Sequence, residues 1–576
     1  MDNSDDSVLA PPSPRPAEDR VETPPLRSES AAWPQMQALL DLLLILAVFA
    51  VSFVPFAPLL GLYSDDWLFM EQLSTAPDQS LTGLTSHLFH LQPHARMRPL
   101  HLFYTALQYF LFGEAPPAFH LTNGLVLYGA LAFFYLFLRA LALPRALAVS
   151  VPILYALLPH CSTTRLWFAA AQANLSMLFF FFASWSLVAA VRAGAARRSA
   201  WSVAAIIAVV ASGLSYEPVL SLALVSGALA WRLGERRRWV GPLVLFPATA
   251  VSVALIKAAV TVRVAEDHSF ASSLLSARYL SQGWDVLEAS LIDLGVELPM
   301  LALRLLGDQT ALQENRLLGA LAVVILLGIS IALFVITRGD GAGSRPLLSR
   351  GSWSKVALAG LAVFALGYAV FLPVGYLPPV TAGDMNRTAV ASTAGVALFI
   401  AGIVGFGCRW LGSFGRLAFA AIIGVIAAAA FIVSGSIAAF WIASGMRQEQ
   451  MIAGVRAHLP VPPAGSVVLL DQTCFTEHPG PLFNLDFGPA LRHRFGRRDV
   501  TGNSALGGLA VGPDGVGIRD ARFEPQHYPW GGSLFAYLFI SDDFIPLTGH
   551  EAAAEWLERR QVDCPAPSVK ALLLSF

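Results

Sequence analysis

Charged residues are scarce in this sequence of 576 residues. Only 13% are Asp, Glu, Lys or Arg, and the formal net charge is -1. Affinity for a nucleic-acid backbone requires a clustered excess of Lys and Arg, so the composition gives no support to a nucleic-acid partner. Hydrophobic residues make up 55% of the chain and the mean hydropathy is +0.60. These values exceed those of soluble globular proteins, and they predict a polytopic membrane protein.

Cysteine is also scarce. The four cysteines are Cys161, Cys408, Cys474 and Cys564, and no two of them have the spacing of a zinc finger. A disulfide between Cys474 and Cys564 is compatible with an oxidising compartment, but their spacing alone does not establish it. The sequence likewise lacks a Gly-rich nucleotide loop or a serine-hydrolase elbow in a suitable context.

Long apolar runs define the expected fold class, because a helix needs about 20 apolar residues to cross a bilayer. This criterion predicts an all-α polytopic membrane protein with about eleven transmembrane helices. The expected spans lie near residues 37–60, 118–140, 146–160, 167–191, 199–215, 217–233, 240–258, 317–337, 354–374, 389–407 and 417–441. The third, fifth and sixth are short enough to be tilted or re-entrant, which gives a range of about nine to thirteen spans. The acidic segment Trp284–Gly307 predicts an interfacial helix rather than a span.

The distribution of Lys and Arg predicts the orientation. Most basic residues fall in alternate loops, which places the N-terminus in the cytoplasm. Residues 1–35 are rich in Pro, Ser and acidic groups and predict a disordered cytosolic segment, followed by a span that serves as a signal anchor. The transmembrane region is then 36–444, with an extracytoplasmic first loop at residues 61–117. Residues 445–576 have ordinary charge density and predict a small extracytoplasmic α/β domain.

A dense group of polar residues begins at Tyr63-Ser64-Asp65-Asp66-Trp67, directly after the first apolar run. Asp65 and Asp66 have two interpretations. Acidic residues in the first turn of a helix are favoured by the helix dipole, with Ser64 or Asp65 as the N-cap. Alternatively, two carboxylates at a membrane surface meet an interfacial substrate, and their mutual repulsion raises one pKa toward that of a general base.

Four arginines in predicted outer segments are candidates for binding phosphate: Arg96, Arg98, Arg165 and Arg387. The planar guanidinium group donates two parallel hydrogen bonds to phosphate oxygens. The alternative for Arg96 and Arg98 is that they flank an interfacial helix, with their stems on apolar surface and their charges in water.

Two further ionisable residues lie near the ends of later apolar runs. Lys257 is inside the seventh run, where an unpaired ammonium group is costly, so it either lines a polar cavity or extends outward. Glu217, in Ser215-Tyr216-Glu217-Pro218, either begins a helix or faces an outward-opening cavity.

Histidines are concentrated in and after the first loop. His87, His90 and His94 have helical spacing that permits a metal site, although such clusters on interfacial helices are more often solvated. A divalent metal is therefore a hypothesis that the sequence leaves open. We expect His94 and His120 to line the same cavity as Glu217.

The order of these motifs resembles a known class of enzymes. An N-terminal span is followed at once by an outer loop with the acidic pair; Arg98-Pro99-Leu100 then opens a helix that ends at Leu111-Phe112-Gly113, and Pro116 to His120 with Asn123 leads into the next span. This layout resembles the GT-C class of integral-membrane glycosyltransferases, which includes protein O-mannosyltransferases and lipid A aminoarabinose transferases. The likeness covers residues 37–220 well and the later spans in general layout only. Many relatives have Asp-Glu where this chain has Asp65-Asp66.

The resemblance implies a polyprenyl-phosphate-linked sugar as donor and an acceptor that approaches from outside. It also implies that the first-loop aspartate is the catalytic base, and Asp65 aligns with the first acidic residue of the pattern. One carboxylate is then sufficient, because polyprenyl phosphate leaves without protonation, and attack on the opposite face inverts the anomeric carbon. The phosphate-binding residues would be Arg98 and Arg387, followed by Arg96, Arg165 and Lys257.

Two other classes of function remain open at this point. A transporter or flippase would show a repeated half-and-half layout with discontinuous helices, and the sequence has no such repeat. A non-catalytic membrane protein would use its C-terminal domain to support an envelope-assembly complex.

Overall fold

The computed structural model describes residues 32–92, 94–223, 240–265, 277–292, 296, 300, 316–339, 350–371, 384–472, 482–505, 508–519, 526–531 and 533–560. Residues 1–31 of the predicted disordered segment 1–35, the pair Cys474 and Cys564, and most of the second half of the predicted interfacial helix lie outside these residues. The last four residues of the predicted disordered segment instead begin a helix. The first half of the predicted interfacial helix is α13 (Ala277–Ile292).

Seven helical stretches in the described chain are long and apolar enough to cross a membrane. They are α1 (Ala32–Phe53), α5 (Pro116–Ala140), α8 (Ala171–Arg192), α9 (Ala195–Ser215), α16 (Arg316–Gly339), α17 (Arg350–Ala369), and one stretch of 73 residues that contains α18 (Val390–Cys408) and α19 (Gly415–His458). Between the last two, a short 3-10 segment, η8 (Arg409–Phe414), contains Gly412 with φ 54°, so the chain turns there. Multi-pass membrane character thus agrees with the sequence, whereas the count of eleven spans stays a prediction.

Two other apolar helices are shorter. The predicted third span is α6 (Arg145–Leu157), which has 13 residues and contains Pro152. The predicted seventh span is α11 (Val240–Ala265), whose apolar part is Phe246–Lys257. The sixth predicted run, 217–233, is described only to residue 223, and there it forms a 3-10 turn, η4 (Leu220–Leu222), instead of a regular helix.

The boundaries of two predicted spans were wrong. The fourth was expected from residue 167, but residues 159–166 form the short turns η3 (Pro159–Cys161) and α7 (Thr163–Leu166), and α8 begins only at Ala171. Trp167 is extended there, and its indole N–H donates to the carbonyl of Tyr63. The last span was expected to end near 441, but α19 continues to His458.

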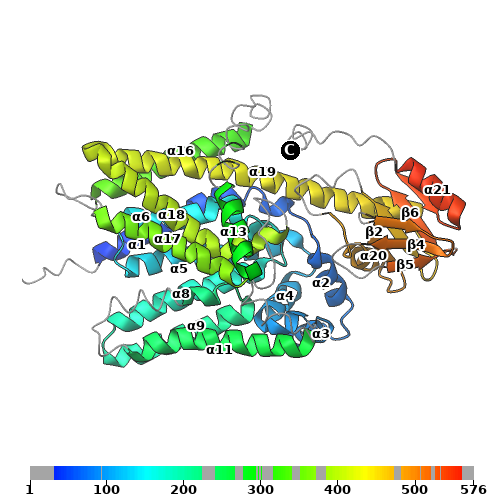
Figure 1. The fold of residues 1–576 in the computed structure, drawn as a ribbon, viewed down its shortest axis with the longest axis horizontal. Coiled ribbons are helices and arrows are strands. Elements are labelled where there is room, and N and C mark those ends of the chain that lie inside the picture. Colours follow the sequence, from blue (N-terminus) through cyan, green and yellow to red (C-terminus); the bar gives the residue numbers. More distant parts are fainter. Residues whose placement is uncertain are drawn as a thin grey trace, which may run out of the picture.

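The extension of α19 has a helical burial pattern. Gln448, Met451, Ile452 and Val455 are buried and spaced three or four residues apart, so one face of the polar end of this helix packs inward. In Figure 1, α19 runs from the helical bundle to the C-terminal sheet, and α2, α3 and α4 lie between the two parts.

The first loop folds into helices. It follows η1 (Ala57–Leu59) and contains α2 (Asp65–Ser74), α3 (Leu81–Leu91), η2 (His94–Met97) and α4 (Pro99–Phe112). Successive long helices run in opposite directions through the bundle (Figure 1). One end of each of α5, α8, α9 and α18 therefore approaches this loop. Side chains from distant parts of the sequence therefore meet beside the first loop.

The C-terminal part contains two sheets. The first has the strand order β2-β1-β6-β7, with β1 (Val467–Asp471) parallel to β2 (Thr501–Ser504) and β6 (Leu534–Leu538), and with β7 (Asp543–Pro546) antiparallel at the edge. The second is antiparallel and contains β3 (Gly508–Val511), β4 (Gly515–Arg519) and β5 (Gln526–Pro529). Two helices, α20 (Phe487–Phe495) and α21 (His550–Arg559), complete it. These elements agree with the expected α/β character.

Candidate functional site

The two aspartates at the start of α2 have opposite environments. Asp66 is fully buried, and its carboxylate accepts hydrogen bonds from the backbone N–H of Tyr63 at 2.9 Å and of Ala169 at 2.8 Å. Burial raises the pKa of Asp66 well above its ordinary range, and these N–H groups oppose the shift. Asp65 is exposed. Asp66 thus fixes the loop to the segment before α8, while Asp65 faces outward.

The backbone at the start of α2 is held in an uncommon conformation. Ser64 has φ 48° and ψ -123°, and its side chain makes no capping hydrogen bond. Positive φ is unfavourable for a residue with a side chain, and it persists only where the surroundings impose it. The indole N–H of Trp67 donates to Gln448 of α19 at 2.9 Å, and that of Trp167 donates to the Tyr63 carbonyl at 2.9 Å. These contacts hold Asp65 in a defined position.

Three predicted residues meet in one ion-pair network. Arg98 is the N-cap of α4, and its Nη2 atom lies 3.0 Å from the Oε2 atom of Glu217. Lys257 of α11 approaches the other carboxylate oxygen at 2.6 Å and also donates to the carbonyl of Gly213 at 2.6 Å. Burial opposes the ionisation of Glu217, but the charges of Arg98 and Lys257 outweigh it and lower its pKa to about 2. That Glu217 and Lys257 line a cavity stays a prediction.

Arg387 joins the same group through two aromatic side chains. It lies in the 3-10 segment η7 (Asp384–Ala389), its guanidinium carbon is 4.8 Å from the centre of the Trp167 ring, and it hydrogen bonds Tyr216. The guanidinium carbon of Arg98 is 4.7 Å from the centre of the Tyr216 ring. We call Arg98, Lys257, Arg387, Tyr216 and Glu217 the cation cluster. With three cations and one carboxylate it carries net positive charge, and Trp167 connects it to the Asp65 loop.

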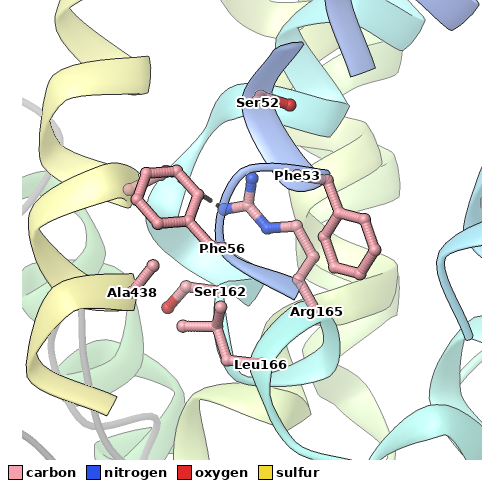
Figure 2. A pocket seen from close by; sticks show the side chains of 8 residues that line it. Ser52, Phe53, Phe56, Ser162, Arg165, Leu166 and Ala438 are labelled. Carbon is pink, nitrogen blue, oxygen red and sulfur yellow. Dashed lines mark hydrogen bonds between the residues drawn. The ribbon is translucent and has the colours of Figure 1, made fainter. Parts of the chain in front are cut away.

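Arg165 is placed elsewhere. Its guanidinium group is buried and donates to the carbonyls of Ala156 and Leu158 and to the hydroxyl of Ser434. Figure 2 shows it between Phe53 and Phe56, in a small pocket that Ser162, Leu166 and Ala438 also line. These donors terminate α6, whose last carbonyls lack partners within the helix. The position favours a structural role over the binding of a phosphate.

The remaining predicted residues also lie outside the cation cluster. Arg96 donates to the carbonyls of Phe89 and His90 and so caps α3. His120 is buried, with its Nε2 atom 2.9 Å from the carbonyl oxygen of Gly61, and ties α5 to the start of the first loop. His94 belongs to η2, and its side chain is outside the described part.

The described residues contain no group of three or more His, Cys, Asp or Glu side chains arranged to hold a metal ion. His90 instead contacts the carbonyl of Ser86 through its Nδ1 atom at 2.7 Å. His101, beside the cation cluster, is buried; burial and the nearby charge of Arg98 lower its pKa to about 3, so it is neutral near pH 7. The histidines therefore supply no support for a metal within this part of the chain.

Sequence reasoning missed two aromatic residues and one amide of this site. Tyr216 and Trp167 connect the arginines, and Gln172 accepts from Arg98 at 3.4 Å. The only signal for Tyr216 was its place beside Glu217. Trp167 and Gln172 lay in a run that was assigned to a transmembrane helix, so nothing marked them as part of a site.

No protein-family model and no curated protein matches the chain. Among solved structures, it is similar to ArnT from Cupriavidus metallidurans bound to undecaprenyl phosphate, with 16% identity and a TM-score of 0.33 over 82% of this chain and 86% of that one. It is also similar to the oligosaccharyltransferase of Archaeoglobus fulgidus in the apo form, with 13% identity and a TM-score of 0.35 over 81% of this chain. Both are GT-C glycosyltransferases.

Two of the solved structures that the chain is similar to thus belong to the class that the first loop resembles. The chain spans 64% of the length of the Archaeoglobus fulgidus oligosaccharyltransferase, and the same share of the form tethered with an acceptor peptide.

Proposed function

We propose that this chain is a membrane glycosyltransferase that moves a sugar from a polyprenyl-phosphate-linked donor to an extracytoplasmic acceptor, with inversion at the anomeric carbon. The observation that carries the proposal is the placement of an exposed carboxylate, Asp65, on a loop that Trp167 connects to the cation cluster. A sugar phosphate needs a base on one side of the anomeric carbon and positive charge on the other.

The cation cluster would bind the phosphate of the donor. As the bond between the anomeric carbon and the phosphate oxygen breaks, its electron pair stays on the phosphate and negative charge grows there. Arg98 and Arg387 are held by ring contacts before any ligand arrives, so they stabilise this charge without reorganising. Glu217 pairs with both Arg98 and Lys257 and offsets part of the repulsion between these two cations.

Asp65 would take the proton of the acceptor hydroxyl as its oxygen attacks the anomeric carbon from the opposite face. Polyprenyl phosphate leaves as an anion and needs no proton, so a second carboxyl group acting as general acid is unnecessary. Asp66 is not suited to this task because both of its oxygens accept hydrogen bonds from buried N–H groups. Its role is to hold Asp65 in place.

The decisive experiment follows radiolabelled sugar from a purified polyprenyl-phosphate donor in the presence of the purified protein and a membrane extract that contains acceptors. We expect the label to leave the carrier and enter a new product, and Asp65→Asn to prevent this. The matched control is Asp499→Asn, which changes an exposed aspartate paired with Arg497 in the C-terminal part. If label crosses a proteoliposome membrane while still joined to its carrier, the chain is a flippase; if it neither moves nor leaves, a non-catalytic role is indicated.

A further inference from the structure

One face of α2 packs against the C-terminal part of the chain. Trp67, Glu71 and Ser74 are four and three residues apart, so they lie above one another along this helix. All three contact α20. The ring centre of Trp67 lies 6.3 Å from that of His493, and Trp67 belongs to the same buried hydrophobic core as Phe487. The helix that begins with Asp65 is therefore in contact with α20 over most of its length.

Arg492 of α20 and Glu71 of α2 form an ion pair with two hydrogen bonds. The Nε atom of Arg492 donates to one carboxylate oxygen of Glu71, and its Nη2 atom donates to the other at 2.9 Å. The side chains of Arg492 and Glu71 are only 23% and 14% exposed, so salt screens this pair less than a pair in open solvent. Two parallel hydrogen bonds fix an orientation as well as a distance. This pair therefore sets how α2 is oriented relative to α20.

Two further contacts hold the last turn of α2. The Nδ1 atom of His493 lies 3.2 Å from the hydroxyl of Ser74, and its Nε2 atom lies 3.4 Å from Glu114 in the turn between α4 and α5. Arg498 donates to the carbonyl of Thr75, the C-cap residue of α2, at 3.2 Å. The last carbonyls of a helix lack partners within it, and a cation is favoured at that end of the helix dipole. The end of α2 is thus also held by the C-terminal part.

The helix α20 is itself fixed on the parallel sheet. A Cβ atom at Gly488 would lie 2.9 Å from the carbonyl oxygen of Gly502 on β2, and one at Gly502 would lie 2.7 Å from the ring of Phe487. Arg492 also donates through Nη1 to the hydroxyl of Thr501 on β2 at 3.5 Å. Backbones in such close contact cannot slide past each other without a clash. The position of the sheet therefore determines the position of Arg492.

We propose that Arg492 is a positioning residue for Asp65, through which the C-terminal part aligns the catalytic base with the cation cluster. This inference rests on the proposed function of Asp65. Asp65 is the first residue of α2, so it moves when this helix moves. Without the ion pair to Glu71, α2 keeps its apolar contacts but loses the contact that sets its direction. A displacement of about 1 Å at a reacting group can slow a reaction on the order of a hundredfold.

The kinetic test exchanges the two charges. Arg492→Ala and Glu71→Gln should each lower kcat on the order of tenfold, with the KM for the lipid-linked donor within about twofold, because the cation cluster is intact. Glu71→Arg combined with Arg492→Glu restores the pair with opposite polarity and should return kcat to within about threefold of the native value. The matched control is Arg497→Ala, since Arg497 pairs with Asp499 inside the C-terminal part, and it should leave kcat unchanged. A native kcat for Arg492→Ala, or no recovery in the exchanged pair, overturns the proposal.

Hydrogen exchange tests the position of α2 without reference to activity. Backbone amides exchange when a segment opens locally, so loss of the ion pair should raise the exchange rate in residues 65–74 by about threefold or more, well below the melting temperature. The exchange rate of α3, residues 81–91, should stay the same, and the exchanged pair should restore that of α2. Unchanged exchange in α2, or an equal increase in α2 and α3, overturns the proposal.

These experiments separate this inference from the proposed function. If Asp65→Asn retains full activity, the assignment of Asp65 as base fails, and the positioning role of Arg492 fails with it. If Asp65→Asn is inactive while Arg492→Ala turns over at the native rate, the base assignment survives and only the positioning role of Arg492 is rejected.

Discussion

Asp65 and Asp66 illustrate how neighbouring residues of the same type acquire different roles. One carboxylate is exposed, whereas the other is buried and accepts two backbone N–H groups from different segments. A carboxylate that has lost its water and gained fixed donors serves the structure, because moving it leaves those donors unsatisfied. The chemistry is therefore assigned to the carboxylate that a substrate can reach.

Asp65→Asn should abolish turnover, by at least about a hundredfold, because it keeps the shape of the side chain and removes its basicity. Expression and donor binding should be nearly unchanged, and transfer of radiolabelled sugar measures the effect. Asp66→Asn should instead lower the melting temperature. The NH2 group of the new asparagine would face one of the two backbone N–H groups that the carboxylate now accepts, and two donors cannot bond each other. If Asp65→Asn is fully active and Asp66→Asn is inactive, the roles of the two aspartates are exchanged. If both variants are active, the enzymatic interpretation of this loop is wrong.

Arg98→Ala and Arg387→Ala should each reduce turnover on the order of a hundredfold, as expected for loss of one donor that stabilises charge in a transition state. Steady-state rates with the lipid-linked donor provide the measurement. Arg96→Ala is the matched control from the same loop, because Arg96 caps α3 and has no contact with the cation cluster in the described structure. Activity within about threefold for both Arg98→Ala and Arg387→Ala would place the phosphate elsewhere.

At the scale of elements, Glu217 joins α4 and α11 to the segment after α9. Arg98 and Lys257 lower its pKa to about 2, so its contribution to stability is present above its ordinary pKa and is lost only as the pH falls toward 2. Glu217→Gln leaves two cations without their shared carboxylate, and Lys257 is nearly buried. We expect a loss of up to about 3 kcal/mol, since breaking a buried pair is strongly destabilising.

Thermal unfolding of Glu217→Gln between pH 5 and pH 8 checks this expectation. The decrease in melting temperature relative to the native protein should be constant across this range, because Glu217 stays ionised throughout it. A decrease that disappears by pH 5 would show that Glu217 is already protonated there and would contradict its pairing with Arg98 and Lys257.

At the scale of the whole molecule, the prediction concerns orientation. The first-loop helices α2, α3 and α4 and the C-terminal sheets lie toward one end of the bundle, and the turn between α8 and α9 lies at the other (Figure 1). Arg192 at the end of α8 and Arg197 and Arg198 at the start of α9 flank this turn. The positive-inside rule then predicts a cytoplasmic N-terminus. In a cysteine-free background, cysteines at Ser86 and Ser541, both exposed, should react with a membrane-impermeant maleimide in intact cells.

A cysteine at Ser199, an exposed residue near the start of α9, should be protected until the cells are permeabilised. Ser504 is unsuitable as a probe because it is buried in the C-terminal sheet. Protection at Ser86 together with labelling at Ser199 would invert the topology and place the Asp65 loop in the cytoplasm.

The sequence by itself determined the membrane class, the positions of most long helices, and the resemblance carried by the first loop. Each depends on residues that are close together in the chain: apolar runs of about 20 residues, or an acidic pair directly after one of them. It also identified Arg98, Glu217, Lys257 and Arg387 individually, since ionisable groups at the ends of apolar runs are uncommon and costly.

Only the tertiary structure decided which of these residues belong together. Arg98 and Arg165 are both arginines in predicted outer segments, yet one joins Glu217 and Tyr216 while the other caps α6. Trp67 gave no sign in the sequence of its contact with His493, because the two residues meet only after α20 packs on α2. Contacts between residues hundreds of positions apart depend on how helices pack, and the spacing of residues along one helix does not encode that.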